Sequence, residues 1–180
     1  MNKARRAVPV VAFSGPSGSG KTRLLVRLVR ALGASGIRVG AIKHSGHPHG
    51  FDVAGKDSDL LLRAGALAVA VQGPAQLAVF GPPRTGGAQA LARLLPPVDL
   101  VLVEGWRSEH LPRIEVHRRS VDRTFLCAGG RRFIAVVSDE PPPRKLPVFA
   151  HDEVDRLAEF LRAHFRLRRC PSSPRRPSST

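Results

Sequence analysis

The sequence of 180 residues predicts an α/β fold in which a mostly parallel sheet is flanked by helices. Two observations lead to this fold class. Segments rich in Val and Ile alternate with segments whose leucines recur at helical spacing, as in chains of βαβ units. The aliphatic run at residues 100–103 is unbroken, which is typical of a strand buried on both faces of a parallel sheet.

The first strand is expected at residues 8–13, where β-branched side chains dominate. A helix is expected at residues 21–34, because leucines recur on one helical stripe and arginines on another. Between them the chain fits the pattern G-x-x-x-x-G-K-[ST] at every required position. A strand, this loop and a helix in that order define a P-loop, so the predicted fold is of the P-loop NTPase type.

Each required residue of the P-loop has a physical task. Its glycines let the loop curl so that successive backbone N–H groups point at an anion. Lys21 is expected to reach the β- and γ-phosphates of a nucleotide, and the Thr22 hydroxyl to hold Mg²⁺. The positive end of the following helix faces the same phosphates. The predicted nucleotide-binding residues here are Gly15, Pro16, Ser17, Gly18, Ser19, Gly20, Lys21 and Thr22.

The remaining elements follow from periodicity and from Gly and Pro punctuation. Further strands are expected at residues 37–42, 98–103, 113–117, 133–137 and 147–150, and helices at residues 56–64, 87–95 and beyond Asp152, which is expected to cap the last one. Residues 66–71 and 77–80 are separated by Gly73-Pro74 and are expected to pair as an inserted strand pair. The alternation at residues 113–117 predicts a strand with one wet face.

The composition indicates anionic partners, because 29 Lys and Arg residues against 14 Asp and Glu residues give a net charge of +15. Pro, Ser and Arg dominate from Arg166 onward, so we expect a nucleotide-binding domain at residues 1–165 and a disordered tail at residues 166–180. The chain has no Tyr and no aromatic residues interleaved with its basic ends. This argues against sequence-specific nucleic-acid binding and leaves weak, salt-sensitive contacts as the role of the basic tail.

Cysteine usage and hydropathy indicate a cytoplasmic protein. The two cysteines, Cys127 and Cys170, do not make a disulfide framework or a zinc site. No apolar run approaches the roughly 18 residues that a membrane span requires. The basic N-terminus is followed by the first strand and the P-loop instead of a signal-peptide core.

A P-loop protein needs an acid beside the loop to hold Mg²⁺ or to orient water. Glu104 follows the buried strand at residues 98–103 and is therefore expected at the carboxyl edge of the sheet. Asp99 begins the same strand, but five strand residues span roughly 16 Å, so only one of the two acids can reach the site. Edge placement favours Glu104. Asp57 is a second candidate catalytic and metal-binding residue, the alternative being an ordinary acid at a helix N-terminus.

Other polar residues leave alternatives open. His44, His47 and His49 could form a metal site, although no cysteine is near, or they could bind substrate phosphate or lie in solvent. Arg63 is either a cation at a helix C-terminus or an anion ligand. Asp139 ends a strand, where a carboxylate can accept hydrogen bonds from guanine N1–H and its exocyclic amine, which adenine cannot supply together. The alternative for Asp139 is a plain loop acid.

Taken together, these stretches resemble the molybdopterin-guanine dinucleotide biosynthesis adaptor family, MobB. The P-loop alone is generic, and the order of the more specific stretches carries the resemblance. They are Ile42-Lys43-His44, Phe51-Asp52 leading to Gly55-Lys56-Asp57-Ser58, Arg63-Ala64-Gly65-Ala66, Asp99 to Glu104-Gly105-Trp106, and Pro112-Arg113-Ile114-Glu115-Val116.

The resemblance implies a GTP-binding protein with at most slow hydrolysis. It would act beside the guanylyltransferase that attaches GMP to molybdopterin, and molybdopterin is a further candidate ligand. The resemblance also implies a homodimer, with a strand pair exchanged or docked between subunits. In this chain Glu104 and Asp57 would complete the Mg²⁺ site, and the loop at residues 44–52 with Arg63 would face the γ-phosphate or the pterin. The alternative function is a P-loop small-molecule kinase or ligase, for which only the short loop at residues 44–55 could serve as a lid.

Overall fold

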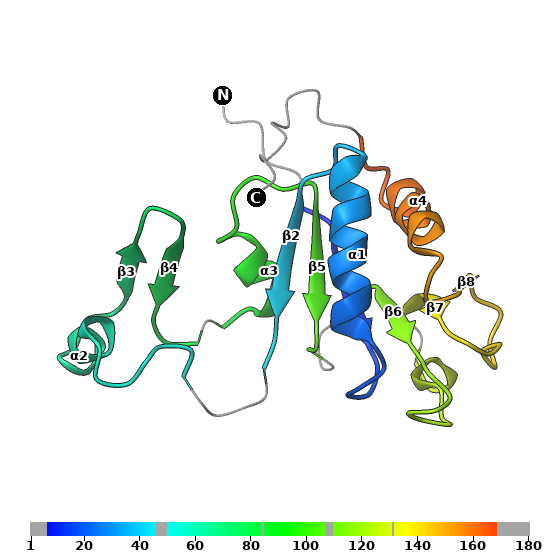
Figure 1. Cartoon of the computed structure of the whole chain (residues 1–180), viewed down its shortest axis with the longest axis horizontal. Helices are drawn as coiled ribbons and strands as arrows, with labels where there is room; N and C mark the ends of the chain where they lie inside the picture. The colour runs from blue at the N-terminus through cyan, green and yellow to red at the C-terminus, as the bar shows by residue number, and fades with distance from the viewer. Residues whose placement is uncertain (1–6, 46–49, 84, 107–109, 131, 169–180) are drawn as a thin grey trace. The chain divides into compact units, whose positions relative to one another are not determined.

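The computed structural model describes residues 7–45, 50–83, 85–106, 110–130 and 132–168. The chain divides into two compact units. The first consists of Met1–Ser45 together with Gly87–Thr180, and the second of Gly46–Gly86. The expected nucleotide-binding loop lies in the first unit, and the inserted strand pair lies in the second (Figure 1).

The first unit is built on a sheet that has six strands within the described residues, in the order β2-β5-β1-β6-β7-β8 (Figure 1). Each pair of neighbours in this sheet is parallel, so the predicted α/β class with a mostly parallel sheet is confirmed. The strands are β1 (Val10–Ser14), β2 (Val39–Lys43), β5 (Leu100–Glu104), β6 (Arg113–Val116), β7 (Phe133–Val137) and β8 (Val148–Phe149).

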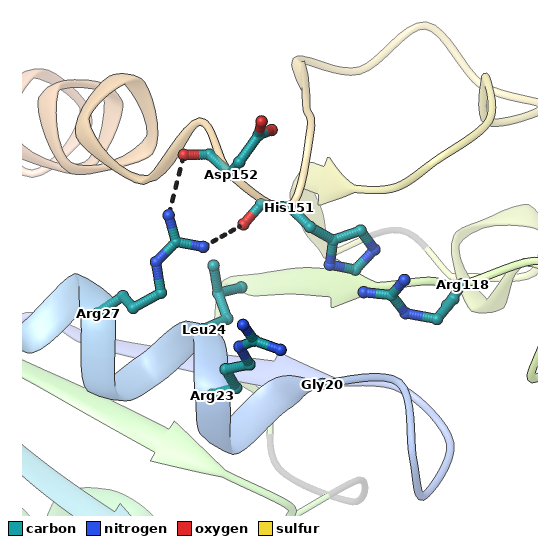
Figure 2. A pocket seen from close by; sticks show the side chains of 7 residues that line it. All are labelled: Gly20, Arg23, Leu24, Arg27, Arg118, His151 and Asp152. Carbon is teal, nitrogen blue, oxygen red and sulfur yellow. Dashed lines mark hydrogen bonds between the residues drawn. The ribbon is translucent and has the colours of Figure 1, made fainter.

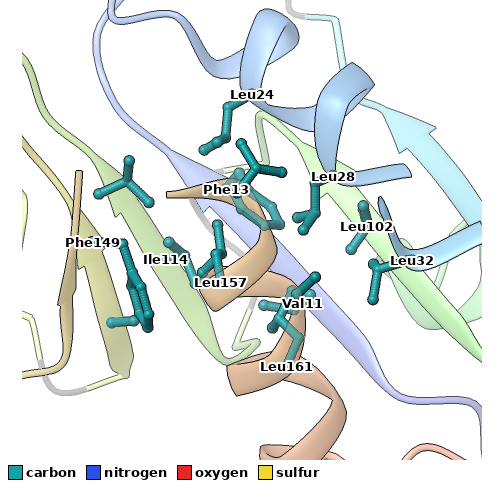
Figure 3. Close-up of a cluster of buried hydrophobic side chains, with 14 of the residues drawn as sticks. Val11, Phe13, Leu24, Leu28, Leu32, Leu102, Ile114, Phe149, Leu157 and Leu161 are labelled. Atoms are coloured by element: carbon teal, nitrogen blue, oxygen red, sulfur yellow. The ribbon is translucent and has the colours of Figure 1, made fainter. Parts of the chain in front are cut away.

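Alternate side chains of the central strands enter two separate hydrophobic cores, because successive residues of a strand face opposite sides of the sheet. Val11 and Phe13 of β1 meet leucines of α1 (Lys21–Ala34) and α4 (Val154–His164) on one side (Figure 3). Val10 and Ala12 pack on the other side with alanines of α3 (Gly87–Ala92). Helices on both faces explain why the strand at residues 100–103 is aliphatic throughout.

Helix α1 is held in place by one stripe of leucines four residues apart. Leu24, Leu28 and Leu32 are at most 3% exposed, and all three belong to the core that α1 shares with β1 and β5. Fully burying a side chain of this size stabilises the fold by roughly 1.5–3 kcal/mol. This packing fixes α1, and therefore the P-loop at its N-terminus, against the sheet.

Strand β6 was predicted to have one wet face, and this prediction is wrong. Arg113, Glu115 and His117 are 8%, 0% and 0% exposed, because β6 lies in the sheet interior between β1 and β7. These polar groups are buried with partners. The Glu115 carboxylate accepts hydrogen bonds from the backbone N–H groups of Leu126 and Cys127 at 2.7 and 2.8 Å. The alternation therefore marks a buried hydrogen-bonded network and not a solvated face.

The predicted cap of the last helix is also corrected. The residue that precedes α4 is Glu153, and no side chain caps the helix, so Asp152 does not have this role. Glu153 instead accepts a hydrogen bond from the Ala150 N–H at 2.9 Å. Most of the predicted tail, from residue 169 onward, lies outside the described residues. Among the helices described, none is long and apolar enough to cross a membrane.

The second unit contains the short helix α2 (Asp57–Arg63) and an antiparallel hairpin of β3 (Val69–Gln72) and β4 (Leu77–Phe80). The hairpin matches the strand pair expected on either side of Gly73-Pro74. It forms a sheet of two strands, and large apolar side chains lie exposed on it, with Leu77 and Val79 63% and 65% exposed.

Candidate functional site

The candidate site lies at the carboxyl edge of the parallel sheet, where ligands of open α/β sheets usually bind. Strand register brings several predicted residues to this edge. Phe13 aligns with Glu104, so the P-loop leaves β1 beside the end of β5. Lys43, the last residue of β2, also aligns with Glu104, so the next residue, His44, lies at the same edge. Residues far apart in the sequence are therefore neighbours here because their strands are parallel.

The P-loop, Gly15–Thr22, curls between β1 and α1 as its sequence predicts. Gly18 and Gly20 have φ values of 82° and 90°, a left-handed conformation that side chains other than glycine rarely adopt. The Lys21 ammonium lies over the loop and donates hydrogen bonds to the carbonyls of Gly15 and Pro16 at 3.1 and 2.7 Å. The loop therefore combines curled backbone, one cation and a helix N-terminus.

Gly15 is required by close packing and not by its φ angle. An ideal Cβ at Gly15 would lie 2.3 Å from the Val116 carbonyl oxygen and 2.8 Å from Ser19 Oγ, so no larger residue fits. Ser19 itself is 0% exposed, and its hydroxyl has no hydrogen-bond partner among the described residues. A buried polar atom normally has a partner, so the Ser19 hydroxyl is available to a polar ligand group inside the loop.

Thr22 and Glu104 meet across the sheet edge. The Thr22 hydroxyl donates a hydrogen bond to Glu104 Oε1 at 2.8 Å, although the two residues are 82 positions apart. Asp99, the alternative acid, pairs with Arg38 at 2.7 Å at the opposite end of β5. The hydrogen bond and ion pair with Arg38 lower the pKa of Asp99, which keeps it ionised as a structural acid. Glu104 is therefore the acid that the fold places beside the P-loop.

Trp106 lies two residues beyond Glu104 in an unusual backbone conformation. Its φ is 52°, which costs a residue other than glycine roughly 1–2 kcal/mol. Two contacts hold it there. Its ring stacks on that of His44 with centroids 4.6 Å apart, and its carbonyl accepts a hydrogen bond from Arg113 at 3.2 Å. Arg113 also donates to the Ser14 hydroxyl at 2.9 Å, directly before the P-loop. Strained backbone held by several contacts is frequent at functional sites.

Asp139 lies after β7 at the same edge of the sheet. Its Oδ1 accepts a hydrogen bond from the Arg119 N–H at 3.0 Å, and this bond is the main cause that lowers the pKa of Asp139. Neighbouring Glu140 accepts a hydrogen bond from Arg119 and lies 2.9 Å from Nε2 of the buried His117. The Asp139 carboxylate is thus ionised and oriented by the loop that follows β6.

Other predicted site residues lie in the second unit or outside the described residues. Asp57 and Arg63 lie in the second unit, and Asp57 is in the first turn of α2. Arg63 is in the last turn of that helix and pairs with Asp59 at 2.9 Å. His47 and His49 lie outside the described residues. Within the described part of the chain, no three His, Cys, Asp or Glu side chains are grouped to hold a metal ion.

Four residues at this edge were not predicted as part of the site: Arg113, Trp106, Arg118 and His151. The last two lie two residues after the ends of β6 and β8, so the rule that ligands bind at carboxyl strand ends could have indicated them. Arg113 lies at the beginning of β6, and its hydrogen bond to Ser14 connects it with the P-loop. No sequence pattern reveals such a contact.

The parallel sheet, the curled loop between β1 and α1, and the acid at the end of β5 define a P-loop NTPase-type α/β protein. More particularly, the chain belongs to the MobB family, described as molybdopterin guanine dinucleotide synthesis protein B, whose model matches residues 10–139. The resemblance expected from the sequence is therefore confirmed.

Relatives and a solved structure agree with this family. The molybdopterin-guanine dinucleotide biosynthesis adapter protein of Escherichia coli strain K12 is 36% identical over 160 residues, which cover 86% of this chain and 91% of the relative. The protein of the same name from Haemophilus influenzae is 32% identical, covering 86% and 88%. The crystal structure of a MobB homologue from Bacillus stearothermophilus is 27% identical, covers 89% of this chain and 99% of its own, and has a TM-score of 0.60.

Proposed function

We propose that this chain binds GTP with Mg²⁺ at the P-loop and acts as an adaptor in molybdopterin guanine dinucleotide synthesis, the process for which its family is named. The observation that carries the proposal is the hydrogen bond between Thr22 and Glu104 beside the curled loop. It joins the metal-binding hydroxyl of the P-loop motif to the acid that the fold places next to it.

The loop suits a chain of phosphates. Gly15 lets the loop pack closely against the Val116 carbonyl, and the buried Ser19 hydroxyl has no partner among the described residues. Lys21 supplies the counter-charge beside the loop backbone. Glycine backbone, hydroxyl and ammonium are the donors with which P-loops hold the β- and γ-phosphates.

The residues beside the loop also suit Mg²⁺, which takes oxygen ligands and usually binds through one or two carboxylates together with phosphates and water. Thr22 and Glu104 would hold the ion directly or through water. Asp57 of the second unit is a further proposed ligand. Because Glu104 already accepts a hydrogen bond from the Thr22 hydroxyl, it is better suited to hold the metal than to activate water, so we expect hydrolysis to be slow at most.

Asp139 is proposed to select guanine. In competition binding the wild-type chain is expected to prefer GTP over ATP, and Asp139→Asn is expected to reduce that preference about 10-fold, the effect of losing one charged hydrogen-bond acceptor. Asn retains an oxygen for the Arg119 N–H, so the loop should keep its conformation. Asp155→Asn, which changes an exposed acid on α4, is the control. Unchanged selectivity in Asp139→Asn would remove this residue from the site.

We further propose a homodimer formed through the hairpin of the second unit. A hairpin of two strands is at best marginally stable alone, and exposed apolar side chains such as Leu77 and Val79 indicate a surface that another chain covers. Sedimentation of the wild-type chain at micromolar concentration is expected to give the mass of a dimer. Val79→Glu should shift the mass towards the monomer, whereas Val26→Glu on α1, also an exposed valine, should not. A monomeric wild type would refute the dimer.

The proposed protein partner is the guanylyltransferase that attaches GMP to molybdopterin, with molybdopterin itself as a further candidate ligand. The net charge of +15 favours an acidic partner surface, because complementary charge accelerates association. We propose the cytoplasm as the site of action and the basic tail from residue 166 as dispensable for nucleotide binding.

A further inference from the structure

A pocket beside the end of the P-loop was not among the predicted sites. It is a cavity of about 240 Å³ between the start of α1 and the loops that follow β6 and β8 (Figure 2). It is lined by Gly20, Arg23, Leu24, Arg27, Arg118, His151 and Asp152. We call it the cationic pocket, because basic side chains make up most of this lining.

The positive charge of the cationic pocket is largely uncompensated. The side chains of Arg23 and Arg118 make no hydrogen bond or ion pair with the residues that the structure describes, and both point towards the pocket (Figure 2). Arg27 instead ties α1 to the loop after β8, donating to the carbonyls of His151 and Asp152 at 3.0 and 3.3 Å. The Asp152 carboxylate points away from the pocket (Figure 2). Two guanidinium groups facing one small space favour an anionic occupant.

The hydrogen bonds of His151 define what its ring offers to a ligand. Nε2 lies 2.9 Å from the His117 carbonyl oxygen, which can only accept, so Nε2 carries a hydrogen. Burial lowers the pKa of His151, and the neighbouring Arg118 charge acts in the same direction. The ring is therefore neutral near pH 7, and its Nδ1 is an acceptor. An acceptor of this kind suits a hydroxyl or N–H group of a ligand.

The size and position of the cationic pocket indicate which part of a ligand can enter it. Pockets that enclose a whole small-molecule ligand usually measure roughly 300–1,000 Å³, so this cavity suits only part of one. It adjoins the P-loop directly, because an ideal Cβ on Gly20 would lie 4.0 Å from Arg118 Nη2. A ligand with its terminal phosphates in the P-loop would continue past Gly20 into the cationic pocket.

We propose that the cationic pocket receives the nucleoside monophosphate end of the nucleotide, with Arg118 neutralising the α-phosphate and His151 accepting a hydrogen bond from the ribose or the base. This inference rests on the proposed GTP site and names the residues that complete it. Asp139 lies near both side chains, since its charge raises the pKa of His151 and Arg118 lowers the pKa of Asp139. Asp139 does not line the pocket, but it lies close enough for its charge to act on His151.

The test is equilibrium titration with Mg²⁺ and either GTP or inorganic tripolyphosphate, which lacks the nucleoside. His151→Asn is expected to lower GTP affinity about 10-fold and to leave tripolyphosphate affinity unchanged, because it alters only the nucleoside contact. Arg118→Ala is expected to weaken both ligands about 10-fold, because both carry a phosphate at the α position. Arg30→Ala, which removes an exposed arginine of α1 outside the pocket, is the matched control and should change neither.

The outcomes separate this inference from the proposed function. If the wild-type chain binds GTP and both variants bind it equally well, the pocket assignment is refuted while the P-loop site stands. A parallel loss of both ligands in His151→Asn would show that His151 supports the loop and does not contact the nucleoside. Arg118→Ala removes no hydrogen bond to the described residues, so it tests the pocket even if the histidine variant folds poorly. If the wild type binds neither ligand, the proposed function fails and the inference fails with it.

Discussion

Replacement of Lys21 by Ala is expected to lower GTP affinity at least 100-fold. Lys21 is the only cation that the structure places within the P-loop itself, where it hydrogen-bonds the loop carbonyls of Gly15 and Pro16. Removing one partner of a desolvated charge pair costs roughly 2–5 kcal/mol, and 2.7 kcal/mol corresponds to about 100-fold in affinity. Calorimetric titration with GTP and Mg²⁺ measures this loss directly.

Lys145→Ala is the matched control for Lys21→Ala, because it removes the same unit of charge from the loop between β7 and β8, away from the P-loop motif. It should bind GTP like the wild type. Circular dichroism and thermal unfolding should show that Lys21→Ala keeps its fold, since the lysine contributes to neither hydrophobic core. A folded Lys21→Ala protein that retained wild-type GTP affinity would mean that the nucleotide binds elsewhere.

Thr22→Val is expected to abolish most of the gain in GTP affinity that Mg²⁺ provides. Valine has the shape of threonine but lacks the hydroxyl that hydrogen-bonds Glu104 at 2.8 Å and that we propose binds the metal. Losing one group that holds a metal typically costs about 10- to 100-fold in metal affinity. Thr22→Ser, which keeps the hydroxyl, should behave like the wild type. Glu104→Gln should also reduce the gain from Mg²⁺, because it removes the carboxylate charge proposed to hold the metal, although its amide oxygen can still accept the hydrogen bond from Thr22.

The fluorescence of Trp106 can be used to measure how Mg²⁺ affects GTP binding in the Thr22 variants. It is the single tryptophan of a chain without tyrosine, and it lies two residues after Glu104, stacked on His44. Its fluorescence should change when Mg²⁺ and GTP bind to the wild type and to Thr22→Ser, and much less for Thr22→Val. An identical Mg²⁺ dependence of GTP binding in Thr22→Val and Thr22→Ser would exclude Thr22 and Glu104 as the metal site.

The centre of the fold could be predicted because its signals are local. The strand before the P-loop, the loop itself and the leucine stripe of α1 are each contained in a short stretch of sequence. The position of Glu104 also followed from a simple rule, because an acid directly after a buried parallel strand must lie at the carboxyl edge. The structure adds the partner that the sequence could not name, the Thr22 hydroxyl.

The features that the sequence did not predict depend on contacts between distant segments of the chain. The alternation in β6 is the same whether its polar residues face water or a buried network. The two cases are distinguished by the hydrogen bonds that Glu115 accepts from the backbone N–H groups of residues 126 and 127. The cationic pocket forms because Arg118 and His151 follow two separate strands and meet above the start of α1. Asp57 lies in the second unit, and its role in the metal site stays a prediction.

The most direct test of the central claim is calorimetric titration of the purified wild-type chain with GTP, in the presence and absence of Mg²⁺. We expect saturable binding of one GTP per chain that is clearly tighter with Mg²⁺, because the P-loop with Lys21 holds the phosphates while Thr22 and Glu104 hold the metal. An absence of saturable GTP binding with Mg²⁺, by a chain shown to be folded, would contradict the account.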